Sequence, residues 1–151
     1  MEIYYTSDTH SYVYPTDYVS REDKATGYMV LSSMFKDDAL KIDGGDVLQG
    51  SPLVRFEMKR ENSPLMAAKA FNAAGLDVFV PGNHDFDFGY ETLRSFTASL
   101  DAEVVCANLQ DEKGQLKIRP YAVIEKNGVK VFITGAVTDY VNVWDKDKLS
   151  G

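Results

Sequence analysis

Three short apolar runs in this chain each end in a polar residue, and the three ends are almost evenly spaced. Asp8, Asp46 and Asn83 lie 38 and 37 residues apart, each just after a predicted strand. That interval is typical of a β-α-β unit, whose crossover returns the chain parallel to the previous strand. Parallel strands have their C-terminal ends along one edge of the sheet, where open α/β sheets carry their sites. The spacing therefore predicts that these three side chains meet.

Periodicity and end signals divide the rest of the chain into alternating strands and helices. Ser51-Pro52 and Ser63-Pro64 are typical N-cap and first-turn pairs, and Gly75 is a typical helix stop. The expected strands cover 2–7, 39–42, 77–80 and 103–107, and the expected helices cover 27–36, 51–59, 65–74 and 90–100.

A hairpin is expected near the end of the chain. Two extended runs, 121–125 and 129–134, flank Asn127-Gly128, which is a strong signal for a two-residue turn. Strands that alternate with helices and then enter a hairpin predict an α/β fold with a mixed sheet and flanking helices. With 151 residues, 44% of them hydrophobic, the chain has the size of a single domain.

Both histidines of the chain lie beside the polar strand ends. His10 follows the first strand, and His84 stands next to Asn83 and three residues before Asp87. Carboxylates, an amide oxygen and imidazoles are suitable ligands for Mn²⁺, Zn²⁺, Fe or Mg²⁺. Each cluster by itself would be an ordinary turn or solvated loop. Their joint occurrence, in order and at strand ends, predicts one metal site.

Composition limits the partners and the location. The formal charge of -7 disfavours a nucleic-acid polymer or an anionic membrane as partner. No apolar run approaches the roughly 20 residues of a membrane span. The single cysteine, Cys106, excludes an intramolecular disulfide and is expected to be a buried apolar residue. Because no basic and apolar leader follows Met1, a cytoplasmic location is expected; a secreted or periplasmic protein whose leader was removed is the alternative.

Taken in order, the polar motifs form a longer signature. Its parts are Asp8-x-His10, then Gly45-Asp46, then Gly82-Asn83-His84-Asp85. This signature resembles the first half of that of the calcineurin-like metallophosphoesterases. More narrowly, the stretches 45–52, 83–89 and 107–109 resemble the 5′-nucleotidase and cyclic-nucleotide phosphodiesterase branch. The resemblance covers essentially the whole chain and implies the first half of a metallophosphoesterase αββα sandwich.

The resemblance also implies a ligand set for two divalent metal ions. Asp8 and His10 would bind one ion, Asp46 would bridge both, and Asn83 would bind the second. Two such ions would activate a water for in-line attack on phosphorus. The implied activity is hydrolysis of a nucleotide or another small phosphoester, by a 5′-nucleotidase or a 2′,3′-cyclic-nucleotide phosphodiesterase/3′-nucleotidase.

The resemblance further implies which groups act on the substrate. Asn83 and His84 would contact the scissile phosphate, and His84 would stabilise or protonate the leaving oxygen. Asp87 would orient the imidazole of His84. A histidine with a carboxylate partner is held in one tautomer and has its charged form favoured.

The chain departs from the family signature after His84. The family completes its site with later Gly-His and Gly-His-x-His motifs and a second domain, whereas no histidine follows His84 here. Residues 1–151 are therefore expected to be a single, truncated N-terminal part of the catalytic domain, inactive alone and binding fewer than two metal ions tightly. Its incomplete sheet would leave an exposed edge and invite self-association.

Two other functions stay open at this point. A non-catalytic, half-length module that binds metal or phosphate would use the same residues. A metallophosphoesterase directed at sugars or DNA is a weaker alternative, and the acidic charge counts against DNA.

Overall fold

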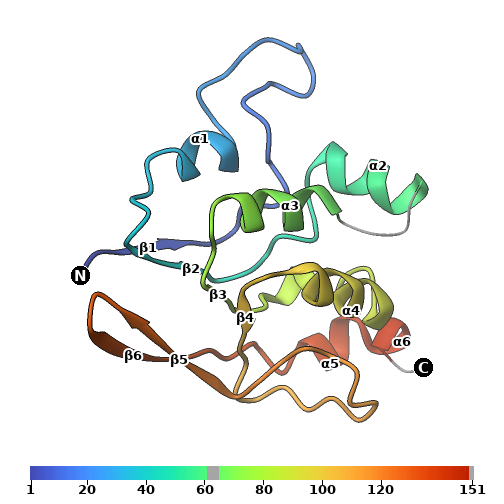
Figure 1. The fold of residues 1–151 in the computed structure, drawn as a ribbon. Helices are drawn as coiled ribbons and strands as arrows, with labels where there is room; N and C mark the ends of the chain where they lie inside the picture. Colours follow the sequence, from blue (N-terminus) through green and yellow to red (C-terminus); the bar gives the residue numbers. More distant parts are fainter. Residues whose placement is uncertain (61–64, 150–151) are drawn as a thin grey trace.

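A four-stranded parallel sheet forms the centre of the structure, a computed structural model that describes residues 1–60 and 65–149 (Figure 1). The strands follow one another across the sheet in the order of the chain. They are β1 (Ile3–Thr6), β2 (Leu40–Asp43), β3 (Val78–Phe79) and β4 (Glu103–Val104).

The register of this sheet aligns the strand ends. Thr6 pairs with Asp43, Asp43 with Phe79, and Phe79 with Val104, so the last residues of all four strands form one row. The loops that follow the strands therefore start at the same edge, as the spacing of the polar motifs predicted.

Helices follow the strands: α1 (Tyr28–Ser32), α2 (Pro52–Arg60), α3 (Leu65–Ala73), the 3₁₀ helix η1 (Asn83–Phe86), α4 (Tyr90–Ser99), α5 (Val141–Trp144) and α6 (Lys146–Leu149). The hydroxyl of Ser51 accepts a hydrogen bond from the amide of Val54 at 3.2 Å, which confirms the predicted N-cap of α2. Gly75 follows α3 with φ +67°, as expected of a helix stop. The predicted Ser63-Pro64 start of α3 lies outside the described residues.

α1 is shorter than the helix predicted for this stretch. The hydroxyls of Ser32 and Ser33 donate hydrogen bonds to the carbonyls of Met29 and Val30, at 3.3 and 2.7 Å. Serine side chains that bond to nearby carbonyls compete with helical hydrogen bonding. The amide of Phe35 then bonds to the carbonyl of Ser32 at 3.0 Å, three residues back, in a tighter turn. The helix therefore ends at Ser32.

An aromatic cluster joins the helices α3 and α4 to one face of the sheet. The ring of Phe79 on β3 lies 6.1 Å from that of Phe71 and 5.4 Å from that of Phe96, measured between centroids. Its neighbour Val78 points to the opposite face, because successive strand residues alternate. Both residues are fully buried, so the sheet has packing partners on both faces.

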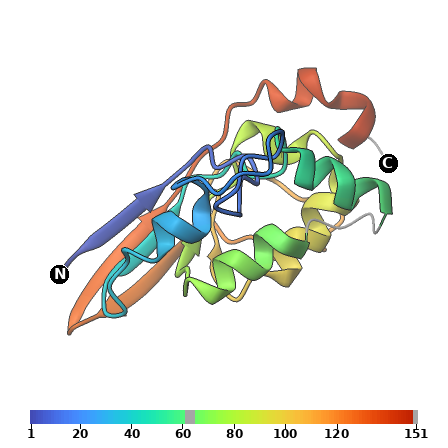
Figure 2. The same ribbon diagram turned by 90° about the horizontal axis from the view of Figure 1, so that it is seen from above.

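The partner on the second face is the hairpin β5 (Tyr121–Lys126) and β6 (Val129–Thr134), which forms its own antiparallel sheet. Ala122 and Ile133 of the hairpin pack against Val78 and other residues of the parallel strands. In Figure 1 the hairpin lies below the parallel strands and α3 above them, and Figure 2 shows the hairpin running in nearly the same direction as β1. The layers are thus helix, parallel sheet and antiparallel sheet. The α/β class and the start of an αββα sandwich are confirmed, with the two kinds of pairing in separate stacked sheets.

The turn of the hairpin is the one predicted. Asn127 and Gly128 have φ +54° and +75°, the pair of left-handed conformations that a two-residue turn of this kind requires. The outer face of the hairpin is uncovered in the described structure: Val123 and Phe132 are 54% and 61% exposed. None of the described helices has the length and apolar character needed to cross a membrane.

Candidate metal and phosphoester site

The loops after β1 and β2 are joined by backbone hydrogen bonds. The amide of Asp8 donates to the carbonyl of Gly45 at 2.9 Å, and that of His10 donates to the carbonyl of Asp46 at 3.0 Å. Gly82, in the loop after β3, lies so close that a Cβ there would collide with Asp46. Glycine is therefore required for this close approach, and all three loops meet at one edge of the sheet.

Asp85 ties two of these loops together. Its carboxylate is fully buried and accepts hydrogen bonds from the backbone amides of Gly82, Asp46, Val47 and Leu48 at 2.8 to 3.0 Å. Burial raises the pKa of Asp85 to about 6, although these amides favour the charged form and oppose the rise. No role of its own was predicted for Asp85 from the sequence, because three of its four amide partners lie 37 to 39 residues away along the chain.

A second buried carboxylate, Asp43, lies at the end of β2. It accepts hydrogen bonds from the hydroxyl of Thr6 and from the amide of Gly45. Burial raises the pKa of Asp43 to about 7, and the nearby charges of Asp85 and Asp8 add to the rise. Asp43 was also missed as part of the site, since it lies one residue beyond the strand predicted for 39–42 and outside the polar motifs.

His10 is held in one tautomer. Its Nδ1 lies 3.0 Å from the carbonyl oxygen of Gln49. A carbonyl can only accept a hydrogen bond, so Nδ1 carries the proton and Nε2 presents its lone pair. A backbone carbonyl that orients a histidine in this way is typical of metal-binding histidines. The state of His10 therefore suits the ligand role predicted for it.

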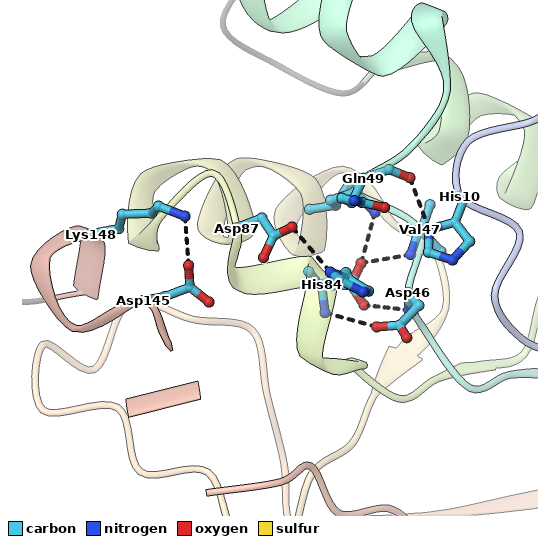
Figure 3. A network of polar contacts seen from close by, with 10 residues as sticks. His10, Asp46, Val47, Gln49, His84, Asp87, Asp145 and Lys148 are labelled. Carbon is cyan, nitrogen blue, oxygen red and sulfur yellow. Dashed lines mark hydrogen bonds and ion pairs between the residues drawn. The ribbon is translucent and has the colours of Figure 1, made fainter. Parts of the chain in front are cut away.

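His84 and Asp87 form the pair that the sequence indicated. Nδ1 of His84 lies 3.1 Å from Oδ2 of Asp87, and the backbone amide of His84 donates to Oδ1 of Asp46 at 2.8 Å. The rings of His10 and His84 have centroids 5.6 Å apart. Figure 3 shows this group, with Asp46 beside His84 and Asp87 on the side away from His10. Four of the predicted site residues are thus direct neighbours.

Backbone strain is concentrated at the predicted ligands. Six non-glycine residues of the described chain have positive φ, and three of them are Asp8 (+55°), His10 (+47°) and Asp46 (+57°). Such conformations cost on the order of 1–3 kcal/mol each and persist where the surrounding structure imposes them. Strain of this kind clusters at functional sites, which is an indication of the site independent of the sequence motif.

The donors present at this edge are of the right chemical types for a divalent metal ion. They are carboxylate oxygens, the Nε2 lone pair of His10 and the amide of Asn83, which starts η1 and is half-buried. Oδ1 of Asp46 is used by the amide of His84, which leaves Oδ2. Within the described ranges, however, no three His, Cys, Asp or Glu side chains are grouped so that they could hold a metal ion. The side chains fit the metal in type but do not form a closed group.

Several known proteins with a similar sequence are named as phosphoesterases. The trifunctional nucleotide phosphoesterase protein YfkN of Bacillus subtilis is 27% identical over 174 aligned positions, which cover all of this chain and 12% of YfkN. The 2′,3′-cyclic-nucleotide 2′-phosphodiesterase/3′-nucleotidase of Salmonella typhimurium is 30% identical, with 100% of this chain and 26% of that protein covered. No protein-family model matches the chain.

Two solved structures with a similar fold have related names. The crystal structure of the calcineurin-like phosphoesterase YfkN has a TM-score of 0.76 at 26% identity, over 99% of this chain and 52% of that one. A 5′-nucleotidase precursor from Thermus thermophilus has a TM-score of 0.71 at 25% identity, over 93% of this chain and 29% of that one. The fold and the sequence thus define a chain homologous over its whole length to the calcineurin-like metallophosphoesterases.

Two of these relatives are named as a 2′,3′-cyclic-nucleotide 2′-phosphodiesterase/3′-nucleotidase and a 5′-nucleotidase precursor. This confirms the resemblance of its motifs. The chain spans 12% of the length of YfkN and 26% of the length of the Salmonella typhimurium enzyme.

Proposed function

We propose that this chain supplies the catalytic histidine and part of the metal coordination of a nucleotide phosphohydrolase. The observation that carries the proposal is the neighbouring pair His10 and His84. Each ring is fixed through Nδ1, and the pair lies beside Asp46 with its strained backbone. The names of the relatives support nucleotides as the substrate class, as 5′-nucleotides or as 3′- and 2′,3′-cyclic nucleotides.

In this proposal two divalent metal ions belong to the complete site. Asp8 and His10 would hold one ion, Asp46 would bridge to the second, and Asn83 would bind that second ion. Bound ions supply positive charge at the phosphate and activate a water for attack. Residues 1–151 alone would hold fewer than two ions tightly and would not turn over substrate.

His84 would act on the substrate itself, together with Asn83. Its Nδ1 is held at Asp87, so Nε2 is the atom that would contact the scissile phosphate and give a proton to the leaving oxygen. The Asp87 carboxylate holds the ring in place and favours its charged form. The role of Asp87 is therefore to position His84 rather than to contact the phosphate.

Phosphate release by the full-length protein tests the proposal. With Mn²⁺ added, the wild type should hydrolyse at least one of adenosine 5′-phosphate, adenosine 3′-phosphate and adenosine 2′,3′-cyclic phosphate. His84→Ala should lower kcat by roughly 10²–10⁴-fold while the metal content by elemental analysis stays unchanged. Asp101→Ala, at an exposed position, serves as control. Hydrolysis of none of the three would refute the enzymatic function, and metal loss in His84→Ala would make His84 a ligand.

A non-catalytic module that binds metal or phosphate is the second candidate. The open arrangement of the ligands in the described residues favours it. Metal binding by the full-length protein without any phosphate release would establish it in place of the enzyme. The cellular location stays a prediction, cytoplasmic or, as the precursor from Thermus thermophilus suggests, exported; fractionation of cells that express the natural gene decides between them.

A further inference from the structure

A cavity of about 630 Å³ lies directly beside the His84–Asp87 pair. Its walls come from the loop before α2, from α2, from the segment between η1 and α4, from Thr92 in α4, and from α6. The lining includes Gln49, Gly50, Asp87, Phe88 and Lys148. A volume of this size lies within the range of small-ligand sites, and none of the roles proposed above uses it.

The cavity is positively charged although the chain carries a formal charge of -7. Arg55, Lys59 and Lys148 line it, against the single carboxylate of Asp87. Asp87 is itself paired with His84. Arg55 and Lys59 are four residues apart on α2, so they lie on one face of the helix.

The cations differ in what already neutralises them. Nζ of Lys148 lies 2.6 Å from Oδ1 of the buried Asp145, as Figure 3 shows. For Arg55 and Lys59 no ion pair with a carboxylate is formed within the described part of the chain. These two side chains therefore keep their charge available for a ligand.

Some residues that line the cavity also contact the proposed site at the edge of the sheet. Gln49 contributes the carbonyl that orients His10, and a Cβ on Gly50 would lie 3.0 Å from Cβ of His10. Asp87 is both a wall of the cavity and the partner of Nδ1 of His84. Phe88, 37% exposed, adds an apolar wall. A ligand in this space would reach from the cations to the proposed site of phosphate attack.

We propose that this cavity is an anion subsite for a second phosphate on the substrate, one that is carried by the leaving group and is not cleaved. Arginine and lysine are the side chains that recognise phosphate, and the ring of Phe88 suits the sugar or base between the two phosphates. The substrate class is then a nucleotide with two phosphates, such as a nucleoside bisphosphate. This inference rests on the proposed function for its substrate, but the subsite can be tested without catalysis.

The first test is phosphate binding by the metal-free chain. Inorganic phosphate is titrated in the presence of EDTA while the backbone amide resonances of Gly50, Phe88 and Thr92 are followed by NMR. The wild type should show saturable shifts at these amides, with a dissociation constant on the order of millimolar. Arg55→Gln/Lys59→Gln should weaken binding roughly tenfold, as expected when two partly exposed charge contacts are removed together.

The matched control is Arg60→Gln on the same helix. Arg60 stacks over the ring of Phe56, at 5.2 Å from its centroid, and does not line the cavity. The Arg60→Gln substitution removes one positive charge from the same helix but no side chain that lines the cavity, so the affinity for phosphate should equal that of the wild type. No saturable shift in the wild type, an unchanged affinity in the double variant or an equal loss in the control would each overturn the subsite.

The second test uses turnover by the full-length protein with Mn²⁺. The double variant should raise KM for adenosine 3′,5′-bisphosphate roughly tenfold and leave KM for adenosine 5′-phosphate unchanged. An equal change for both substrates would contradict a subsite for the second phosphate. If neither of these two substrates is hydrolysed, the metal-free titration decides whether the subsite exists, and the assay with the three adenosine phosphates described above decides the proposed function.

Discussion

Asp85 and Asp43 are single residues on which the geometry of the site depends. Each is fully buried. Asp85 accepts hydrogen bonds from four backbone amides of the site loops, and Asp43 accepts from the amide of Gly45 and the hydroxyl of Thr6. Neither is a predicted ligand. Their effect is indirect, because they hold Asp46 and His84 where the site needs them.

Replacing Asp85 by alanine should destabilise the chain strongly. Four backbone amides would lose their acceptor inside the protein, and buried unpaired amides are expensive. We predict a loss of about 3 kcal/mol in the free energy of unfolding, measured by urea denaturation in EDTA. Asp101→Ala, at an exposed position, should change it by less than about 0.5 kcal/mol. A similar small change for both variants would contradict the role of Asp85.

The stability of the metal-free chain should fall as the pH rises from about 4 to about 7. The pKa values of Asp43 and Asp85 in the folded chain, about 7 and about 6, lie above their ordinary value of 3.8. The folded state therefore binds protons that the unfolded state has already released, and the stabilisation is lost as these groups ionise.

Asp43→Asn tests this pH dependence. The free energy of unfolding is measured at pH 5 and pH 8 by urea denaturation in EDTA. Its drop between these two pH values should be roughly 2–3 kcal/mol smaller in the variant than in the wild type. Equal losses in the two proteins would show that Asp43 does not titrate in this range.

At the scale of elements, the sequence predicted the strands and the hairpin, which have regular spacing or a strong turn signal. It did not predict the hydrogen bonds that end α1 or that join the loops of the site. The 38- and 37-residue intervals indicated parallel strands with aligned ends, and Asn127-Gly128 indicated the hairpin; both are confirmed. The end of α1 was wrong because Ser32 and Ser33 bond to local carbonyls, an effect that apolar periodicity does not show. The functions of Asp85 and Asp43 could not be predicted, since three of the four amide partners of Asp85 and the Thr6 hydroxyl partner of Asp43 are brought near only by the fold.

The outer face of the hairpin should make the isolated chain self-associate. Tyr121, Val123 and Phe132 are exposed there, with the rings of Tyr121 and Phe132 stacked at 4.8 Å. Sedimentation velocity should show association that increases with concentration, and Val123→Lys/Phe132→Lys should remain monomeric. Glu125→Lys, which adds positive charge to the same strand without removing apolar surface, should still associate. A wild type that stays monomeric at all concentrations would contradict this prediction.

At the scale of the whole molecule, acidic and basic side chains lie in two neighbouring regions, the proposed metal site and the proposed phosphate subsite. Acidic groups gather at the edge of the sheet after β1, β2 and β3, where the proposed metal ions would neutralise them. Cations line the neighbouring cavity, where the proposed second phosphate would bind. The two regions meet at Asp87 and Gln49. If both proposals hold, this arrangement explains how a protein with a formal charge of -7 would recognise phosphate.

The central claim is that this edge of the sheet is a metal site bridged by Asp46. Elemental analysis of the full-length protein after loading with Mn²⁺ and removal of free metal tests it most directly. The wild type should retain two metal ions per chain. Asp46→Ala should retain almost none and release no phosphate from nucleotides. An Asp46→Ala protein that keeps two metal ions per chain would contradict the account.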